Sequence, residues 1–269
     1  MVAYNDRLTL LEHLDELRQR LIHAAIGIAI AVLIAALLNR YVFHLLLAPL
    51  NRIHNPDVPH KITTFSPAEP FMVSLKVWVY VGLIIAAPVI IYEFWAFVGP
   101  AFAPTSRRAV VLVVGVCAML FLSGVALAYF VILPKGLEWL FSFNGKYFNT
   151  QARASDYFTF VAWFLVAFGA VFELPVIIVS AVRIGVVSTK TLRKHWRYAI
   201  LINAIIAMLA TPSQDLFSFF GMFIPLEILY ELSLLVARVV ERRRDAVQAV
   251  ENPDDEGPGD GGLSSVPAS

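Results

Sequence analysis

The 269-residue chain contains a single cysteine, and charged residues make up only 15% of it. Cys117 lies inside an apolar segment, so the sequence offers neither a disulfide framework nor a thiolate metal site. The net charge is only +1, and no patch of basic residues interleaved with aromatics suggests nucleic-acid binding. We therefore expect no metal site and no nucleic-acid partner.

Motifs of several enzyme classes are also missing. The sequence contains no HExxH, no GxSxG and no glycine-rich phosphate-binding loop. Ser123 lies in an apolar run, but no histidine lies at a similar depth in another run. These absences argue against proteolysis within the membrane, zinc hydrolysis and nucleotide hydrolysis. We expect no enzymatic activity and no cofactor.

Long apolar runs are what the chain has instead. Hydrophobic residues make up 59% of it and the mean hydropathy is +0.72, outside the range of soluble globular proteins. The pattern predicts an all-α polytopic membrane protein, with one domain over residues 1–240 whose six transmembrane helices form a curved array with a groove. The predicted spans are about 22–38, 71–98, 109–133, 158–182, 198–210 and 216–237.

The segments around these runs carry further predictions. No cleavable signal peptide precedes the first run. Residues 39–69 are polar and proline-containing and predict a loop, Pro134 is expected to close the third span, and residues 241–269 predict a disordered tail. The fifth run would make only about 20 Å of helix, against roughly 30 Å of hydrocarbon. The fifth and sixth spans are therefore expected to be short.

The distribution of lysine and arginine predicts the orientation. With six spans, 14 of these residues fall on the side of the two termini and 6 on the opposite side, and Lys76 lies within a span. Loops rich in Lys and Arg stay in the cytoplasm. Both termini are therefore predicted to be cytoplasmic.

An amphipathic segment, residues 8–21, precedes the first run. Its leucines recur at helical spacing among charged residues, which predicts an interfacial helix ahead of the span. Glu16 belongs to an acidic group on this segment, and Glu93 is expected near the same surface. A carboxylate there can bind a guanidinium through paired hydrogen bonds, a geometry that selects arginine over lysine.

Glu173 is the single ionisable residue in the fourth run. A carboxylate at that depth is costly and marks a candidate functional site. One interpretation is a groove in which a peptide docks its cationic part at the acidic surface and its apolar part along Glu173. Two alternatives stay open: a protonated Glu173 that hydrogen-bonds a neighbouring helix, and a proton-coupled small-solute carrier that uses it as its proton site.

Ten short motifs, in order along the chain, resemble the TatC family, the multi-spanning receptor subunit of the twin-arginine protein translocase. They cover residues from about 8 to 237. The motifs are HLDELRQRL at 13–21, APL at 48–50, SPAEPF at 66–71, APVIIYEFWAFVGPA at 87–101, RR at 107–108, AYFVILP at 128–134, FGAVFELPV at 168–176, LRK at 192–194, TPSQD at 211–215 and LYE at 229–231.

The resemblance implies a protein of the cytoplasmic membrane with six helices and both termini inside. It implies recognition of twin-arginine signal peptides on folded precursors, transport driven by the proton-motive force, and a multimeric complex with the single-span subunits TatA and TatB. It further implies that Glu16 binds the signal-peptide arginines. The other positions that it implies are Leu14 and Arg18 beside Glu16, Pro49 and Phe97 for receptor integrity, Glu173 as the buried acid, Met208 and Leu209 for packing of TatA or TatB, and Asp215 in the outer turn.

The chain departs from the family at Ser106. Family members commonly carry a second arginine-binding glutamate there, and a hydroxyl cannot supply the same charge-assisted bond. Our hypothesis is that Glu93 compensates from the adjacent helix end. Asp215 has a structural alternative as the cap of the sixth helix, and Glu227 and Glu231 either line the cytoplasmic mouth or pair with Arg238.

Overall fold

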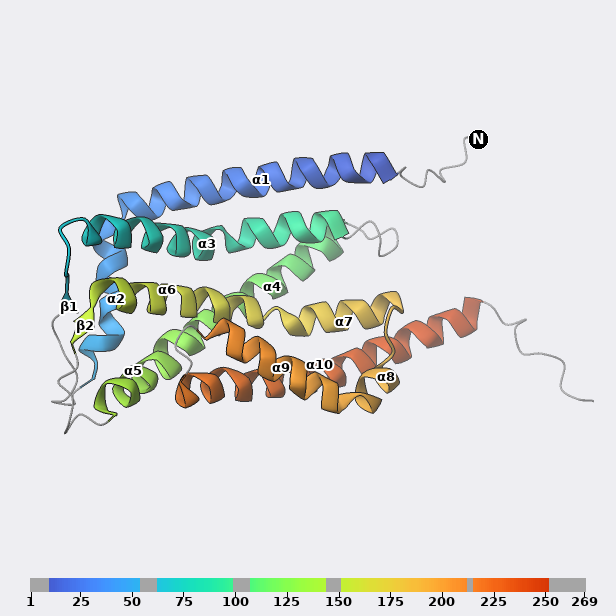
Figure 1. The fold of residues 1–269 in the computed structure, drawn as a ribbon. Helices are drawn as coiled ribbons and strands as arrows, with labels where there is room; N and C mark the ends of the chain where they lie inside the picture. Colours follow the sequence, from blue (N-terminus) through green and yellow to red (C-terminus); the bar gives the residue numbers. More distant parts are fainter. Residues whose placement is uncertain (1–9, 54–61, 99–106, 144–150, 212–214, 252–269) are drawn as a thin grey trace, which may run out of the picture.

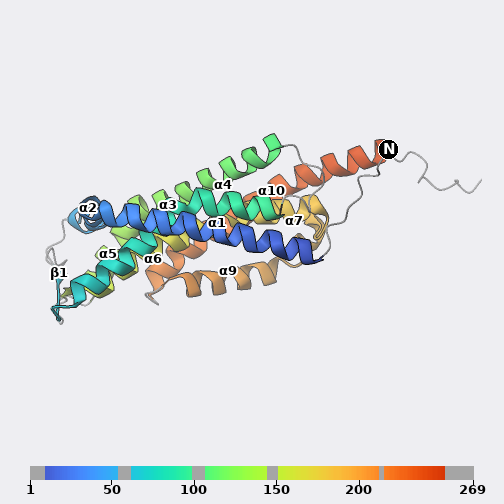
Figure 2. The same ribbon diagram turned by 90° about the horizontal axis from the view of Figure 1, so that it is seen from above.

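The computed structural model describes residues 10–53, 62–98, 107–143, 151–211 and 215–251. Long helices lie side by side in an elongated bundle (Figure 1 and Figure 2). Five helical stretches are long and apolar enough to cross a membrane, and a shorter apolar helix, α9 (Trp196–Ala210), accompanies them. The predicted all-α polytopic class is confirmed. In the described part of the chain the β structure is one parallel pairing of β1 (Ile62–Thr63) with β2 (Ala152–Arg153).

Helix α1 (Leu10–Leu37) is continuous for 28 residues. The predicted amphipathic helix and the first span therefore form one continuous helix, because no proline or glycine interrupts the chain before Gly27. Helix α1 packs along α3 (Glu69–Val98), and the two run in opposite directions (Figure 1). Their contact is close: a Cβ added to Gly82 would lie 2.6 Å from Val32 Cγ2 and 2.9 Å from Val32 Cα.

The segment after the first span is not all loop, because Asn39–Asn51 forms helix α2 with Pro49 inside it. Proline has no N–H to donate to the carbonyl four residues earlier, which here is that of Leu45. The Tyr129 hydroxyl donates to that Leu45 oxygen at 2.8 Å, and the Tyr157 hydroxyl donates to Leu46 O at 2.8 Å. Tertiary contacts thus stabilise a helix that the local sequence disfavours.

The third span does not end at Pro134. Helix α4 (Arg107–Leu127) continues through a π-helical turn, η2 (Ala128–Ile132), into α5 (Leu133–Ser142). A π turn shifts the hydrogen-bond register, so a proline directly after it fits at the start of the next helix. The expected end of the span at Pro134 is wrong.

The fourth span is broken into α6 (Ala154–Val171) and α7 (Leu174–Ile184). The break falls at Phe172 and Glu173. Its cause is Pro175, which has no N–H to donate to Val171 O. Helix α6 is buried along much of its length, with Phe164 and Phe168 almost fully enclosed, and packs against α3 and α4. It forms the centre of the bundle.

The C-terminal part consists of α8 (Thr189–Lys194), α9 and α10 (Leu216–Glu251). Helix α10 packs on α7 and α9, and α9 ends and α10 begins short of the end of the bundle that holds α2 and the strands (Figure 1). Helix α10 is 36 residues long, so the prediction of a disordered tail from residue 241 is wrong for residues 241–251. Thr189 N–H and Oγ1 both donate to the Glu241 carboxylate, which joins α8 to this extension.

Candidate functional site

The first half of α1 lies against the last turns of α3 at one end of the bundle, the end at which α1 begins and α10 ends (Figure 1). The His13 ring stacks on the half-buried Phe97 ring, with centroids 4.4 Å apart and an interplanar angle of 15°. Phe97 is therefore held between the helices and is not directed outward to lipid. This stack sets the position of the residues one to two turns further along α1.

Arg20 joins the two acidic residues that the sequence singled out. Its Nη2 donates to Glu16 Oε1 at 3.3 Å, and its Nη1 donates to Glu93 Oε2 at 3.1 Å. The Glu16 contact spans four residues on α1, with the acid on the N-terminal side, the favourable order on a helix. The side chains are 26% (Glu16), 30% (Arg20) and 13% (Glu93) exposed, so the group is accessible from one side.

His23 completes this group. Its Nδ1 lies 3.8 Å from Glu93 Oε1, on the other carboxylate oxygen from the one that Arg20 binds. We call Glu16, Arg20, His23 and Glu93 the acidic clamp. Sequence reasoning missed Arg20 and His23; the spacing of four between Glu16 and Arg20 was a signal for one contact, but nothing local indicated the contact across to α3.

The chemistry of the acidic clamp is that of a guanidinium site. Two carboxylates from different helices converge on one planar cation, which donates a separate N–H to each. Leu14 is 59% exposed, and Asp15 and Arg18 are exposed as well, on the side of α1 away from α3. They lie beside the clamp but outside its hydrogen bonds, and Ser106 lies outside the described residues.

Glu173 lies elsewhere, at the break between α6 and α7. Its Oε1 is buried and has no hydrogen-bond partner among the described residues, while the fully buried Cys117 thiol of α4 lies close to the carboxyl. Cys117 belongs to an apolar cluster that includes Ile91 and Trp95 of α3. Ile91 and Trp95 are each two residues from Glu93, so they lie on the other face of α3, next to Cys117 of α4.

Glu173 therefore has no charged partner in the described structure, and its side chain is half-buried. The carboxyl is neither turned fully outward nor paired with a cation.

The remaining positions fall on separate surfaces. Met208 and Leu209 on α9 are 58% and 77% exposed, as a surface for another apolar helix requires. Pro49 is buried inside α2. The Asp215 carboxylate accepts from Ser218 N–H at 2.7 Å, so it caps α10, as the structural alternative predicts.

Glu227 was left between two interpretations, and the structure gives a third. Its Oε1 accepts from Asn203 Nδ2 at 3.2 Å. Asn203 is buried on α9, so the hydrogen bond links α9 to α10 and does not involve Arg238.

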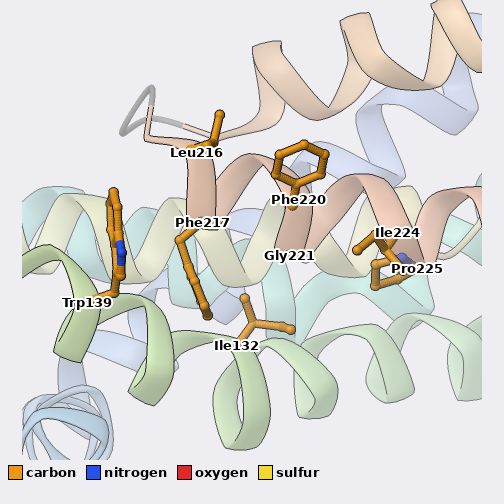
Figure 3. Close-up of a pocket in the computed structure, with 8 residues that line it drawn as sticks. All are labelled: Ile132, Trp139, Leu216, Phe217, Phe220, Gly221, Ile224 and Pro225. Carbon is orange, nitrogen blue, oxygen red and sulfur yellow. The ribbon is translucent and has the colours of Figure 1, made fainter.

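An apolar groove of about 490 Å³ runs between the third span and the start of α10 (Figure 3). Its walls are Ile132 and Trp139 on one side and Phe217, Phe220 and Ile224 on the other, with Gly221 at its floor. The lining carries no ionisable group, so this groove can take only an apolar occupant.

Comparison with known proteins gives consistent matches over most of the chain. A family model described as "Sec-independent protein translocase protein (TatC)" matches residues 12–225. The protein of that name from Desulforapulum autotrophicum is 37% identical, over 90% of this chain and 90% of the relative. The one from Escherichia coli K12 is 33% identical, over 88% of this chain and 91% of the relative. The crystal structure of a twin-arginine translocase receptor, TatC, superimposes with a TM-score of 0.76 at 35% identity, covering 85% of this chain and 99% of that one.

Proposed function

The chain belongs to the TatC family of Sec-independent protein translocase proteins, and from this premise we propose that its acidic clamp binds the twin-arginine motif of signal peptides. It is a multi-pass protein of the inner membrane and a translocase subunit, not an enzyme. The comparisons give no support to the alternative of a proton-coupled solute carrier.

One observation carries the proposal: Glu16 and Glu93 already hold a guanidinium between them, that of Arg20. A signal-peptide arginine has the same group and can form the same two bonds once Arg20 moves aside. Glu93 would then supply the second carboxylate that Ser106 cannot. A lysine ammonium lacks the planar fork and would bond the two carboxylates less well.

The apolar part of a signal peptide follows from the same geometry. Beyond Glu93, the cluster of Ile91, Trp95 and Cys117 leads towards Glu173. Because the cluster is buried, we infer that the apolar segment of the peptide runs over its outer side, with Glu173 near the far end. The half-buried, unpaired carboxyl of Glu173 supports a role in which an incoming polar group completes its hydrogen bonds.

The partners and the orientation belong to the proposal as well. Single-span subunits of the TatA and TatB type would pack on the exposed face around Met208 and Leu209 in a multimeric complex. The Lys and Arg distribution supports a cytoplasmic location for both termini, and the start of α1 and the end of α10 lie at one end of the bundle (Figure 1). The acidic clamp would then face the cytoplasm, where precursors arrive, and transport would draw on the proton-motive force.

The test is the affinity of the purified protein for a fluorescent twin-arginine peptide, compared with a twin-lysine version. Glu16→Gln and Glu93→Gln should each weaken binding of the twin-arginine peptide by about tenfold, the loss of one charge-assisted bond. Asp15→Asn is the matched control, since Asp15 is exposed and adjacent to Glu16 but outside the clamp. Equal affinity for the two peptides, or Glu93→Gln binding as tightly as the wild type, would refute the proposed clamp.

A further inference from the structure

A second pocket, of about 420 Å³, lies at the end of the bundle opposite the acidic clamp, between α3, α5 and the start of α6. Leu137, Phe141 and Phe160 give it an apolar side, and its charged lining residues are Lys76, Arg153 and Asp156. It shares no lining residue with the groove of Figure 3, which has no charges. An apolar wall next to charges of both signs calls for an amphipathic ligand.

The level of this pocket in the membrane follows from Glu69. This first residue of α3 is buried and accepts from Phe65 N–H at 2.8 Å, Arg153 Nε at 2.9 Å and Ser155 N–H at 3.2 Å. These bonds place the start of α3 level with the start of α6. Any membrane position deduced for one helix therefore applies to the other.

Helix lengths then give the depth of the two charges. Helix α3 has 30 residues and is about 45 Å long, so it extends about 7 Å beyond the roughly 30 Å hydrocarbon core at each end. Lys76 is about 10 Å along α3, just inside that boundary, and its flexible side chain can reach back to the headgroups. Asp156, in the first turn of α6, lies in the headgroup layer itself.

The two charges are unmatched. Within the part of the chain that the structure describes, neither Lys76 nor Asp156 takes part in an ion pair or a hydrogen bond. Arg153, the third charged residue of the lining, is paired with Glu69. The pocket thus presents one free cation and one free anion that do not bond each other, and the Thr159 hydroxyl on its lining is buried without a described partner.

We propose that this pocket binds a phosphatidylethanolamine molecule, with the lipid phosphate on Lys76 and its ammonium group on Asp156. The acyl chains then lie against Leu137, Phe141 and Phe160. A purely anionic headgroup would satisfy Lys76 but meet repulsion from Asp156. A choline headgroup carries the same charges, but its methyl groups cannot donate hydrogen bonds to the carboxylate.

The test is lipid retention by the purified protein in native mass spectrometry, with equal amounts of palmitoyl-oleoyl phosphatidylethanolamine, phosphatidylcholine and phosphatidylglycerol. We expect retention of phosphatidylethanolamine severalfold above the other two. Lys76→Gln should reduce its retention about tenfold. Lys135→Gln is the matched control, because Lys135 is an exposed lysine near the same end of the bundle that does not line the pocket.

Asp156→Asn provides an independent second variant. It should abolish the preference for phosphatidylethanolamine over phosphatidylcholine and increase retention of phosphatidylglycerol, because the repelling carboxylate is gone. Equal retention of the three lipids by the wild type, equal losses in Lys76→Gln and Lys135→Gln, or an unchanged lipid preference in Asp156→Asn would each overturn the proposal. Thermal unfolding in detergent shows that each variant is folded before its lipids are counted.

Discussion

Arg20 occupies the place that we propose for a signal-peptide arginine, so its removal should increase the affinity for twin-arginine peptides. Its bonds to Glu16 and Glu93 are 3.3 and 3.1 Å long, and the side chain is 30% exposed. At such exposure, solvent screening reduces each ion pair to about 0.5–1 kcal/mol. Binding of a peptide guanidinium must therefore overcome about 1–2 kcal/mol, and Arg20→Gln should tighten binding by about five- to thirtyfold.

The assay is fluorescence anisotropy of a labelled twin-arginine peptide with the purified protein at fixed ionic strength. Any lost cation strengthens binding of a cationic peptide slightly, so Arg193→Gln, an exposed residue of α8, corrects for net charge. Arg20→Lys should give an intermediate affinity, because its ammonium is a weaker partner for two carboxylates. If Arg20→Gln instead weakens binding, Arg20 positions the two glutamates for the peptide and does not compete with it.

Three further predictions follow from the packing. Gly82→Ala should lower the free energy of unfolding by about 1 kcal/mol or more, because the new Cβ meets Val32 at 2.6 Å. Gly115→Ala is the control: no atom lies within 4 Å of the added Cβ, so this variant should be neutral or slightly stabilising. Equal effects of the two substitutions would contradict the close α1–α3 contact. Tyr129→Phe should cost about 1 kcal/mol in thermal unfolding, because Leu45 O loses its donor, and an unchanged midpoint would show that another group satisfies this carbonyl. Leu209→Asp should reduce co-purification of a TatB-type subunit at least severalfold while leaving peptide affinity intact, and undiminished co-purification would remove α9 from the proposed partner surface.

The fold class was predictable because spans must be continuously apolar. Each transmembrane segment must be apolar on its own to be solvated by lipid, so its apolar run can be recognised in a single sequence. The errors lie where distant contacts override local signals. Pro49 alone disfavours a helix, but Tyr129, 80 residues later, donates to the carbonyl that Pro49 leaves without a backbone donor. Pro134 alone predicts the end of a span, but the π turn before it shifts the hydrogen-bond register.

The candidate site was predictable to a similar degree. Glu16 and Glu93 were identified from their charge near one surface; the resemblance to the family gave a role to Glu16, and the role of Glu93 was our hypothesis from the absence of a glutamate at Ser106. Arg20 was missed because its second bond reaches an acid 73 residues away. Such a contact depends on how α1 and α3 align, and neither segment alone specifies that alignment.

The close contacts of Gly27 with Val89 and of Gly82 with Val32 have a mechanical consequence. Because α1 and α3 cannot slide past each other there without steric overlap, the two helices move as one rigid unit. A cargo that pulls on Glu93 must also displace the N-terminal helix. The force can then spread to the rest of the molecule through α2, which follows α1 in the chain, and across the other sides of α3, where α4 and α6 pack.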